Sequence, residues 1–337
     1  MLSCVLRLIQ MQELPTFHFP FQAMGTPCEL RLYAENEIFA KDVADAAIDE
    51  IRRIERAYSR YRDDNVVYAI NAAAAKSGSI TLDPEAADLL DIAFEAHARS
   101  CGLFDITSGA LREIWHEGID DVPDGAAICG VLRRVGLGKV EWRRPRLAFS
   151  VVGMQIDLGG IGKEFAADRA AEICRAGGIA NGLIDLGGDF AVVGPHPDGS
   201  PWRIGIRDPS DGETAIATLF IGEGGLATSG DYERCWEFSG RRYGHIFDPR
   251  LGFPVEGLRS VSVAAATCLD AGLASTIAML KGKGGPDWLR DTGLPHVCID
   301  AENHVDCASL VMPDDASIRR WMNSPSETAL SAPSCPE

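Results

Sequence analysis

The sequence predicts an α+β fold in which the sheets are mainly antiparallel and helices flank them. Runs of residues with strand character outnumber runs with helical spacing, and the two kinds rarely alternate along the chain. This order disfavours a doubly wound parallel sheet, in which strands and helices alternate. The chain has 337 residues, and 46% of them are hydrophobic. That is enough for a large buried core, in one domain or in two lobes.

The first half of the chain shows two helical patterns and one strand pattern. A helix start is marked by Asp83, which can cap the helix, and by Pro84, which suits its first turn. The other elements follow from the periodicity of apolar residues. The expected elements are a strand at 20–34, a helix at 36–60, a polar loop at 58–64, a helix at 84–100 and an irregular segment at 102–109.

The second half contains two predicted strands that each run into a pair of glycines. The first, 154–157, leads through its glycines into a helix. The second, 182–186, leads through its glycines into another strand. The further elements expected here are helices at 163–176 and 268–281, strands at 190–193, 202–207, 215–221, 234–239 and 258–266, and a hairpin at 296–311.

Composition excludes several classes of protein. The net charge of -17 argues against nucleic-acid binding, which needs stripes of Lys and Arg. No run of about 20 apolar residues is present to span a membrane. The ten cysteines show no CxxC spacing and are expected to be reduced thiols. We therefore expect a cytoplasmic protein, with export by a missed N-terminal signal as the alternative. We also expect an N-terminal extension at 1–19 and a polar, partly disordered tail at 313–337.

The glycine-rich segment Asp157-Leu-Gly-Gly-Ile-Gly-Lys163 is the clearest candidate for ligand binding. Glycines after a strand allow backbone N–H groups to approach an anion closely, and the following helix offers its N-terminus to the same anion. Lys163 is unfavourable in a first helical turn unless a bound phosphate offsets its charge. The alternative is a tight structural turn that simply requires glycine.

Other segments carry side chains suited to binding a planar or phosphorylated ligand. Phe104 and Asp105 pair an aromatic ring with a carboxylate, which can stack on and hydrogen-bond a heterocycle. His245 stands beside loops that carry hydroxyl and carboxylate groups. Asp189 follows the second glycine pair as a cap or a substrate contact. Each of these residues also has a purely structural interpretation.

Taken in order, eight segments resemble the ApbE family of FAD:protein FMN transferases over about residues 20–310. The segments are Met24-Gly-Thr26, Ser59-Arg-Tyr61, Gly102-Leu-Phe-Asp-Ile-Thr-Ser-Gly109, Asp157-Leu-Gly-Gly-Ile-Gly-Lys163, Leu186-Gly-Gly-Asp189, Pro201-Trp-Arg-Ile-Gly-Ile206, Ala227-Thr-Ser-Gly-Asp-Tyr232 and His245-Ile-Phe-Asp-Pro-Arg250.

The resemblance implies a two-lobed, T-fold-like α+β domain over 20–312, with FAD bound in the cleft between the lobes. It also implies a reaction assisted by Mg²⁺. A Thr or Ser hydroxyl of an acceptor protein attacks the FMN-side phosphorus of FAD, AMP leaves, and FMN stays attached through a phosphoester. Some members of the family instead hydrolyse FAD to FMN and AMP.

Individual site residues follow from the resemblance position by position. His245 and Asp270 are the candidate catalytic residues. Gly160, through its backbone oxygen, Thr276 and Asp270 are the candidate metal ligands. The positions that correspond to flavin- or adenosine-contacting residues are Met24, Tyr61, Leu103, Phe104, Asp105, Asp157, Gly160, Lys163 and His245.

The chain departs from the family pattern in its late helix, where the expected metal-binding Asp is replaced by Gly272. Asp270 lies six residues before Thr276, so on a regular helix it points about 120° away from the threonine. Two hypotheses follow: an active transferase in which Asp270 or a substrate phosphate replaces the missing ligand, or a flavin-binding relative without transfer activity, acting as a carrier, a sensor or a weak FAD pyrophosphatase. From sequence alone, Gly272→Asp is expected to raise activity if the ligand count is limiting.

Overall fold

The computed structural model describes residues 14–211, 214–231 and 235–308. The tail predicted at 313–337 lies outside the described residues. The same holds for residues 1–13 of the predicted extension, whereas residues 16–19 belong to the first strand. Within the described ranges, no helix combines the length and the apolar character that crossing a bilayer requires.

An eight-stranded sheet forms the centre of the molecule, in the order β1-β2-β6-β7-β10-β13-β14-β15. Every neighbouring pair in it is antiparallel. The predicted α+β class with mainly antiparallel strands is therefore confirmed. The strands are β1 (Thr16–Ala23), β2 (Thr26–Tyr33), β6 (Gly182–Leu186), β7 (Phe190–Gly194), β10 (Gly225–Gly230), β13 (Leu258–Ala265), β14 (His296–Asp300) and β15 (Val305–Ala308).

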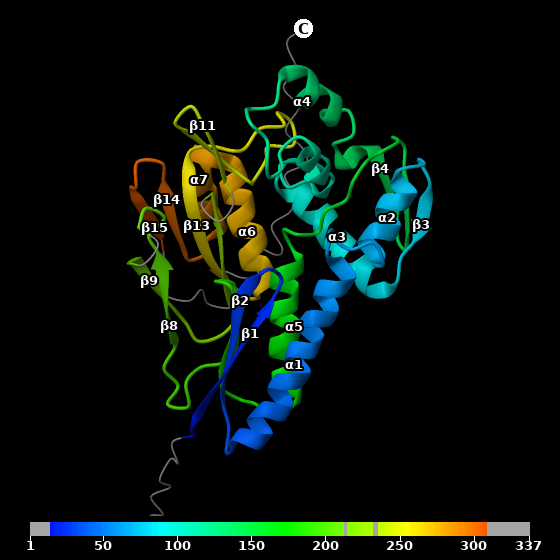
Figure 1. Ribbon diagram of the computed structural model, residues 1–337. Helices are drawn as coiled ribbons and strands as arrows, with labels where there is room; N and C mark the ends of the chain where they lie inside the picture. The colour runs from blue at the N-terminus through cyan, green and yellow to red at the C-terminus, as the bar shows by residue number, and fades with distance from the viewer. Residues whose placement is uncertain (1–13, 212–213, 232–234, 309–337) are drawn as a thin grey trace, which may run out of the picture.

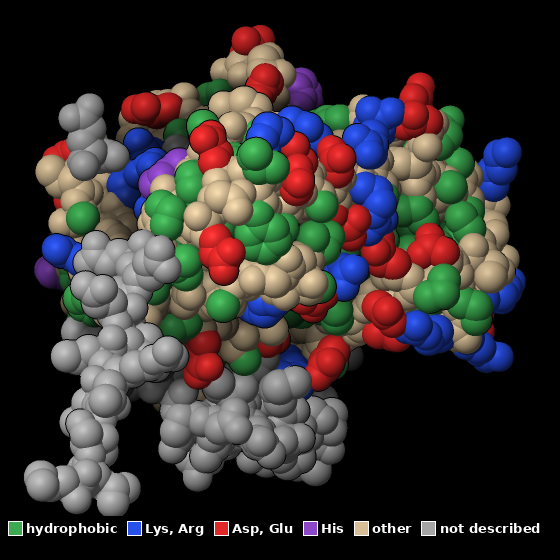
Figure 2. Space-filling model, turned by 90° about the horizontal axis from the view of Figure 1, so that it is seen from below, with side chains coloured by type: hydrophobic (Ala, Val, Ile, Leu, Met, Phe, Trp, Pro, Cys, Tyr) green, Lys and Arg blue, Asp and Glu red, His purple; other side chains and the backbone are tan. Residues whose placement is uncertain are grey.

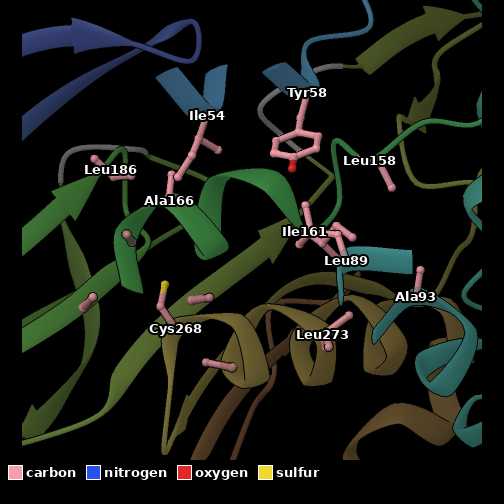
Figure 3. Packing of buried hydrophobic residues seen from close by; sticks show 14 of the residues in the cluster. Ile54, Tyr58, Leu89, Ala93, Leu158, Ile161, Ala166, Leu186, Cys268 and Leu273 are labelled. Atoms are coloured by element: carbon pink, nitrogen blue, oxygen red, sulfur yellow. The ribbon is translucent and has the colours of Figure 1, made fainter. Parts of the chain in front are cut away.

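Three helices cover one face of this sheet, α1 (Glu37–Tyr58), α5 (Gly162–Ala176) and α6 (Cys268–Lys281). Helix α5 packs on β6 and β7, α6 packs on β10 and β13, and α1 lies along α5 (Figure 1). Figure 3 shows Ala166 of α5 beneath Ile54 of α1, with α6 on the other side of α5. The start of α5 is thus held between two helices and above the sheet.

The hairpin of β8 (Trp202–Arg207) and β9 (Ala215–Ile221) covers the opposite face of the sheet. Its inward residues Trp202, Ile204 and Ile206 alternate with exposed ones, as a half-buried strand requires. They pack with apolar residues of β6, β7, β10, β13 and β14. This second apolar layer buries the face of the sheet that the helices leave open.

Most of the remaining elements lie beside the main sheet (Figure 1), whereas the last helix, α7 (Gly285–Thr292), packs on α6. Asp83 caps α3 through the N–H of Ala86, as predicted. A separate apolar cluster surrounds the buried ring of Trp115. The elements beside the sheet are α2 (Val66–Ala74), α3 (Pro84–Arg99), the three-stranded sheet of β3 (Ser79–Thr81), β5 (Arg146–Phe149) and β4 (Val140–Arg143), the 3₁₀ helix η1 (Ile106–Glu113), α4 (Gly125–Leu132), and the hairpin of β11 (Cys235–Phe238) and β12 (Arg241–Gly244).

Two predicted strands were wrong. The single strand at 20–34 is a hairpin, because Met24 and Gly25 both adopt positive φ angles, 52° and 75°, and turn the chain between β1 and β2. The segment 154–157 joins no sheet. Its N–H groups are used elsewhere: Ile156 donates to the side chain of Asn71, and Asp157 donates to the backbone oxygen of Ile106.

The surface seen in Figure 2 carries Asp and Glu side chains interspersed with Lys and Arg side chains. The overall charge of -17 is therefore not gathered into one acidic field on this face. Local positive charge for a phosphate ligand has to come from individual residues at the site.

Replacement of Ile54 by Ala is expected to lower the free energy of unfolding by about 2–4 kcal/mol, because it leaves a cavity between α1 and α5. Ile54 is fully buried, whereas Ile38 on the same helix is 77% exposed and serves as the matched control. The control substitution Ile38→Ala is expected to change the free energy by less than about 0.5 kcal/mol. Urea denaturation followed by circular dichroism measures both. Equal effects would contradict the packing of α5 against α1.

Candidate functional site

The glycine turn at 159–162 ends in the first turn of α5. The turn is closed by hydrogen bonds from the N–H groups of Ile161 and Gly162 to the oxygen of Leu158, at 3.1 and 2.9 Å. Ile161 occupies the N-cap position and makes no side-chain capping bond. The first N–H groups of a helix lack intrahelical acceptors, so a helix start without a side-chain cap can receive an anion.

Lys163, in this first turn, forms an ion pair with Asp189. Its Nζ lies 2.7 Å from Oδ2 of Asp189, and the aspartate side chain is only 3% exposed. The other carboxylate oxygen accepts the N–H of Thr228 on β10 at 3.1 Å. Asp189 therefore joins α5 to β10 and positions the lysine. Both residues were singled out from the sequence, but their pairing was not predicted.

The second glycine pair, Gly187 and Gly188, has a structural role. Both adopt positive φ angles, 68° and 95°, and the N–H of Gly188 is fixed by Asp185 at 2.9 Å. A side chain at Gly187 would collide with Thr26 of β2. The tight turn is what brings Asp189 back toward α5.

Thr276 on α6 belongs to a cluster of hydroxyl groups. Its Oγ1 lies 3.0 Å from Oγ of Ser229 on β10, and the same Ser229 oxygen lies 2.8 Å from Oγ of Ser275. The end of β10 and the middle of α6 are thereby joined. This places a hydroxyl oxygen of the kind that Mg²⁺ accepts at the junction of the sheet and the helix.

Asp270 acts as part of the N-terminal cap of α6. Thr267 accepts the N–H of Asp270 at 3.0 Å and donates its hydroxyl to Oδ2 of Asp270 at 2.8 Å. Helix α6 is continuous from Cys268 to Lys281. The unwinding that a metal-ligand role for Asp270 requires is therefore absent from the described helix. Asp270 remains about 120° around the helix from Thr276.

Asp168, on α5, caps the same helix end. It accepts the N–H groups of Cys268 and Leu269, both at 2.9 Å. Burial raises the pKa of Asp168 to about 6, although these two hydrogen bonds oppose the change. The two helices are thus tied together at the N-terminal end of α6.

Gly272 faces a glutamate of the neighbouring helix. A Cβ atom built on Gly272 would lie 2.5 Å from Cγ and 2.8 Å from Oε1 of Glu164. Glu164 is buried, and its Oε2 has no hydrogen-bond partner in the described structure. Burial, reinforced by the negative charge of Asp189, raises the pKa of this carboxyl. Glu164 was not predicted from the sequence, where its only signal was its place beside Lys163 in the first turn of α5.

Asp157 is held by two arginines at the start of the glycine turn. Its Oδ2 lies 2.8 Å from Nη1 of Arg60 and 3.1 Å from Nε of Arg112, and Oδ1 accepts the N–H of Gly159. Burial would raise the pKa of Asp157, but the two positive charges outweigh it and lower the pKa. Asp157 therefore anchors the start of the glycine turn.

Phe104 and Asp105 have different surroundings. The Phe104 ring lies 3.6 Å from the position of a Cβ on Gly160, so the ring flanks the glycine turn. Asp105 is occupied within its own loop, where it accepts from Thr107 and from the N–H of Leu137 at 2.8 Å. Leu103 is buried in the core.

The remaining predicted contacts, Met24, Tyr61 and His245, lie in turns and loops outside the helices and strands. Met24 sits in the β1–β2 turn, where its N–H donates to Oε1 of Glu55 at 2.6 Å. Tyr61 is 74% exposed in the loop after α1, and His245 follows β12. A hollow of about 400 Å³ lies beside the Met24 turn, and three arginines in its lining carry positive charge. It is lined by Gln22, Arg52, Glu55, Arg56, Ser59 and Arg62.

Comparison with known proteins identifies the family of this chain. A model of the ApbE family matches residues 24–298. The chain is 32% identical over 282 residues to the FAD:protein FMN transferase of Treponema pallidum, covering 77% of each chain. It is 28% identical over 284 residues to the enzyme of that name from Klebsiella pneumoniae, covering 81% of each.

Solved structures show the same fold. The ApbE protein of Thermotoga maritima superimposes with a TM-score of 0.80 at 28% identity, covering 88% of this chain and 97% of that one. The flavin transferase ApbE of Vibrio cholerae gives a TM-score of 0.78 at 24% identity, over 88% and 98% of the two chains. By its sequence and its fold, this chain belongs to the ApbE family.

Proposed function

We propose that this chain is an FAD:protein FMN transferase. The observation that carries the proposal is that Asp189 joins Lys163, at the uncapped start of α5, to strand β10, which also carries Ser229 of the hydroxyl cluster with Thr276. Family membership supports it, since relatives that match most of the chain bear this name. Pyrophosphate cleavage depends on positioning and on neutralising charge, which this constellation suits.

In the proposed reaction, a Thr or Ser hydroxyl of an acceptor protein attacks the FMN-side phosphorus of FAD. The new P–O bond forms as the bond to the AMP oxygen breaks, and AMP leaves. The N–H groups at the start of α5 and the charge of Lys163 hold the phosphates. We assign removal of the hydroxyl proton to His245, because imidazole suits general-base work near neutral pH.

A divalent cation suits the kinds of oxygen atom that α5, its preceding turn and α6 carry. Mg²⁺ takes carboxylate, hydroxyl and backbone oxygens, and it prefers few protein ligands together with substrate phosphates. The backbone oxygen of Gly160, the hydroxyl of Thr276 and a buried carboxylate beside Gly272 would hold it. When bound, Mg²⁺ would neutralise charge on the pyrophosphate.

The replacement of the expected aspartate by Gly272 favours a second candidate, a flavin carrier or a weak FAD pyrophosphatase. The two candidates differ in what happens to the FMN half of FAD. A transferase attaches it to a protein hydroxyl, a pyrophosphatase releases it, and a carrier leaves FAD intact.

Incubation with FAD, Mg²⁺ and an acceptor domain that bears a flavinylation threonine tests these candidates. We expect flavin fluorescence to remain on the acceptor band after denaturing electrophoresis, with one AMP released for each flavin attached. An acceptor with Val in place of the threonine is the control. AMP without covalent flavin would indicate a pyrophosphatase, and bound FAD without AMP would indicate a carrier.

We also propose a cytoplasmic location. The eight cysteines within the described ranges are all unpaired, in keeping with a reducing compartment. Cell fractionation with a C-terminal tag tests this proposal. Recovery of the tagged chain in the exported fraction would contradict it.

A further inference from the structure

The space at Gly272 is already filled by another residue's carboxylate. A Cβ at this position would lie 2.5 Å from Cγ and 2.9 Å from Cδ of Glu164, which is closer than non-bonded atoms approach. Helices α5 and α6 pack against each other here. No side chain of any size fits at 272 while Glu164 keeps this position. The glycine at 272 on α6 and the glutamate at 164 on α5 therefore depend on each other, because Glu164 occupies the space that a side chain at 272 would need.

One carboxylate oxygen of the buried glutamate lacks the partner that a buried polar atom normally has. Glu164 is only 8% exposed, and its Oε2 is inaccessible and accepts no hydrogen bond in the described structure. Leaving a buried polar atom unpaired is unfavourable. Such atoms in native proteins call for an explanation, and an absent ion is one of them.

The Glu164 side chain contacts α6 at position 272, where the metal-binding aspartate was expected. Gly272 and Thr276 are four residues apart on a regular helix, so they lie on the same face, one turn from each other. Glu164 contacts α6 at Gly272. Its carboxylate therefore reaches the face that carries the Thr276 hydroxyl. Asp270, in contrast, is bonded to Thr267 at the helix cap.

We infer that Glu164 supplies the carboxylate ligand of the divalent cation in this chain, in place of the aspartate expected at position 272. The inference rests on the proposed function only in taking a cation to be present at this site. The ligand has moved from α6 to the adjacent helix, and glycine at 272 makes room for the longer side chain. Thr276 and the backbone oxygen of Gly160 complete the protein ligands.

The competing explanation is that Glu164 only fills space, as a neutral carboxylic acid beside Gly272. A space-filling acid and its amide are nearly the same in shape, so Glu164→Gln would leave cation binding unchanged. A ligand loses its charge and most of its affinity in the same substitution. The isosteric variant therefore separates the two explanations.

Binding of Mn²⁺, a paramagnetic probe, can be measured from the loss of the free-ion electron paramagnetic resonance signal, with and without FAD. We expect Glu164→Gln to raise the Kd for Mn²⁺ at least tenfold. The matched control is Glu172→Gln, on the exposed part of α5, where the glutamate pairs with Arg169. Asp270→Asn is the second control, and both are expected to keep wild-type affinity.

The reciprocal exchange Glu164→Gly with Gly272→Asp is expected to restore Mn²⁺ binding to within about threefold of wild type. Unchanged binding in Glu164→Gln, loss in Asp270→Asn, or no Mn²⁺ binding by the wild-type chain would each overturn the inference. Binding that depends on Glu164 without AMP release would leave the inference standing and contradict the transferase function. AMP release combined with an unchanged Mn²⁺ affinity in Glu164→Gln would contradict the inference and leave the proposed function standing.

Discussion

Gly272→Asp is expected to destabilise the protein by at least about 3 kcal/mol instead of activating it. The new Cβ would overlap Glu164, and the new carboxylate would join two buried carboxyl groups, those of Glu164 and Asp189. This reverses the expectation from sequence alone, which was that restoring the aspartate raises activity. Urea denaturation in EDTA measures the free energy of unfolding, and AMP release measures activity.

Gly130→Asp is the matched control for this prediction. Gly130 also lies within a helix, α4, but a Cβ there would meet no atom within 4 Å. Its substitution is expected to change the free energy of unfolding by less than about 1 kcal/mol. Adding Glu164→Gly to Gly272→Asp is expected to recover most of the lost stability. If Gly272→Asp behaves like the control and is more active, Glu164 does not occupy the ligand position.

Lys163→Met is expected to weaken FAD binding by about tenfold to a hundredfold, the usual range for one charge-assisted contact. It should also lower the free energy of unfolding by about 2–4 kcal/mol, because it leaves Asp189 buried without its cation. Quenching of flavin fluorescence in EDTA, where turnover is prevented, measures the affinity. Lys41→Met is the control, since Lys41 pairs with Asp45 on the exposed side of α1.

A second variant separates the two effects of losing Lys163. Lys163→Met combined with Asp189→Asn removes both charges, so stability should largely return while FAD affinity stays low. Wild-type FAD affinity in either variant would contradict the assignment of Lys163 to the ligand. A double variant that is no more stable than Lys163→Met would contradict the structural importance of the ion pair.

The long helices could be predicted from the sequence because their apolar spacing and caps are local signals. Helix α1 begins at Glu37 and ends at Tyr58, inside the predicted 36–60, and α5 and α6 agree as closely. Strand β10 was missed because Gly225–Gly230 consists of small residues without hydrophobic alternation. The turn at Met24 was missed because a positive φ at methionine has no sequence signal.

The site was predicted only in part, because side-chain pairing across elements is not a local property. Lys163 and Asp189 were each identified, but their ion pair depends on how the β6–β7 turn meets α5. The position of the Glu164 side chain depends on the packing of α5 against α6. In the sequence, the absence of the expected aspartate at 272 was the only indication of this contact. A glycine where a ligand is expected is a reason to look for a carboxylate on the adjoining helix.

The most direct measurement is the rate of AMP release from FAD across a Mg²⁺ titration, compared between the wild-type chain and Glu164→Gln. We predict that the wild-type chain releases AMP only when Mg²⁺ is present. Glu164→Gln should need at least tenfold more Mg²⁺ for half-maximal release, with its affinity for FAD in EDTA unchanged. The same Mg²⁺ dependence in both proteins, or no AMP from either, would contradict a flavin transferase whose metal is held by Glu164.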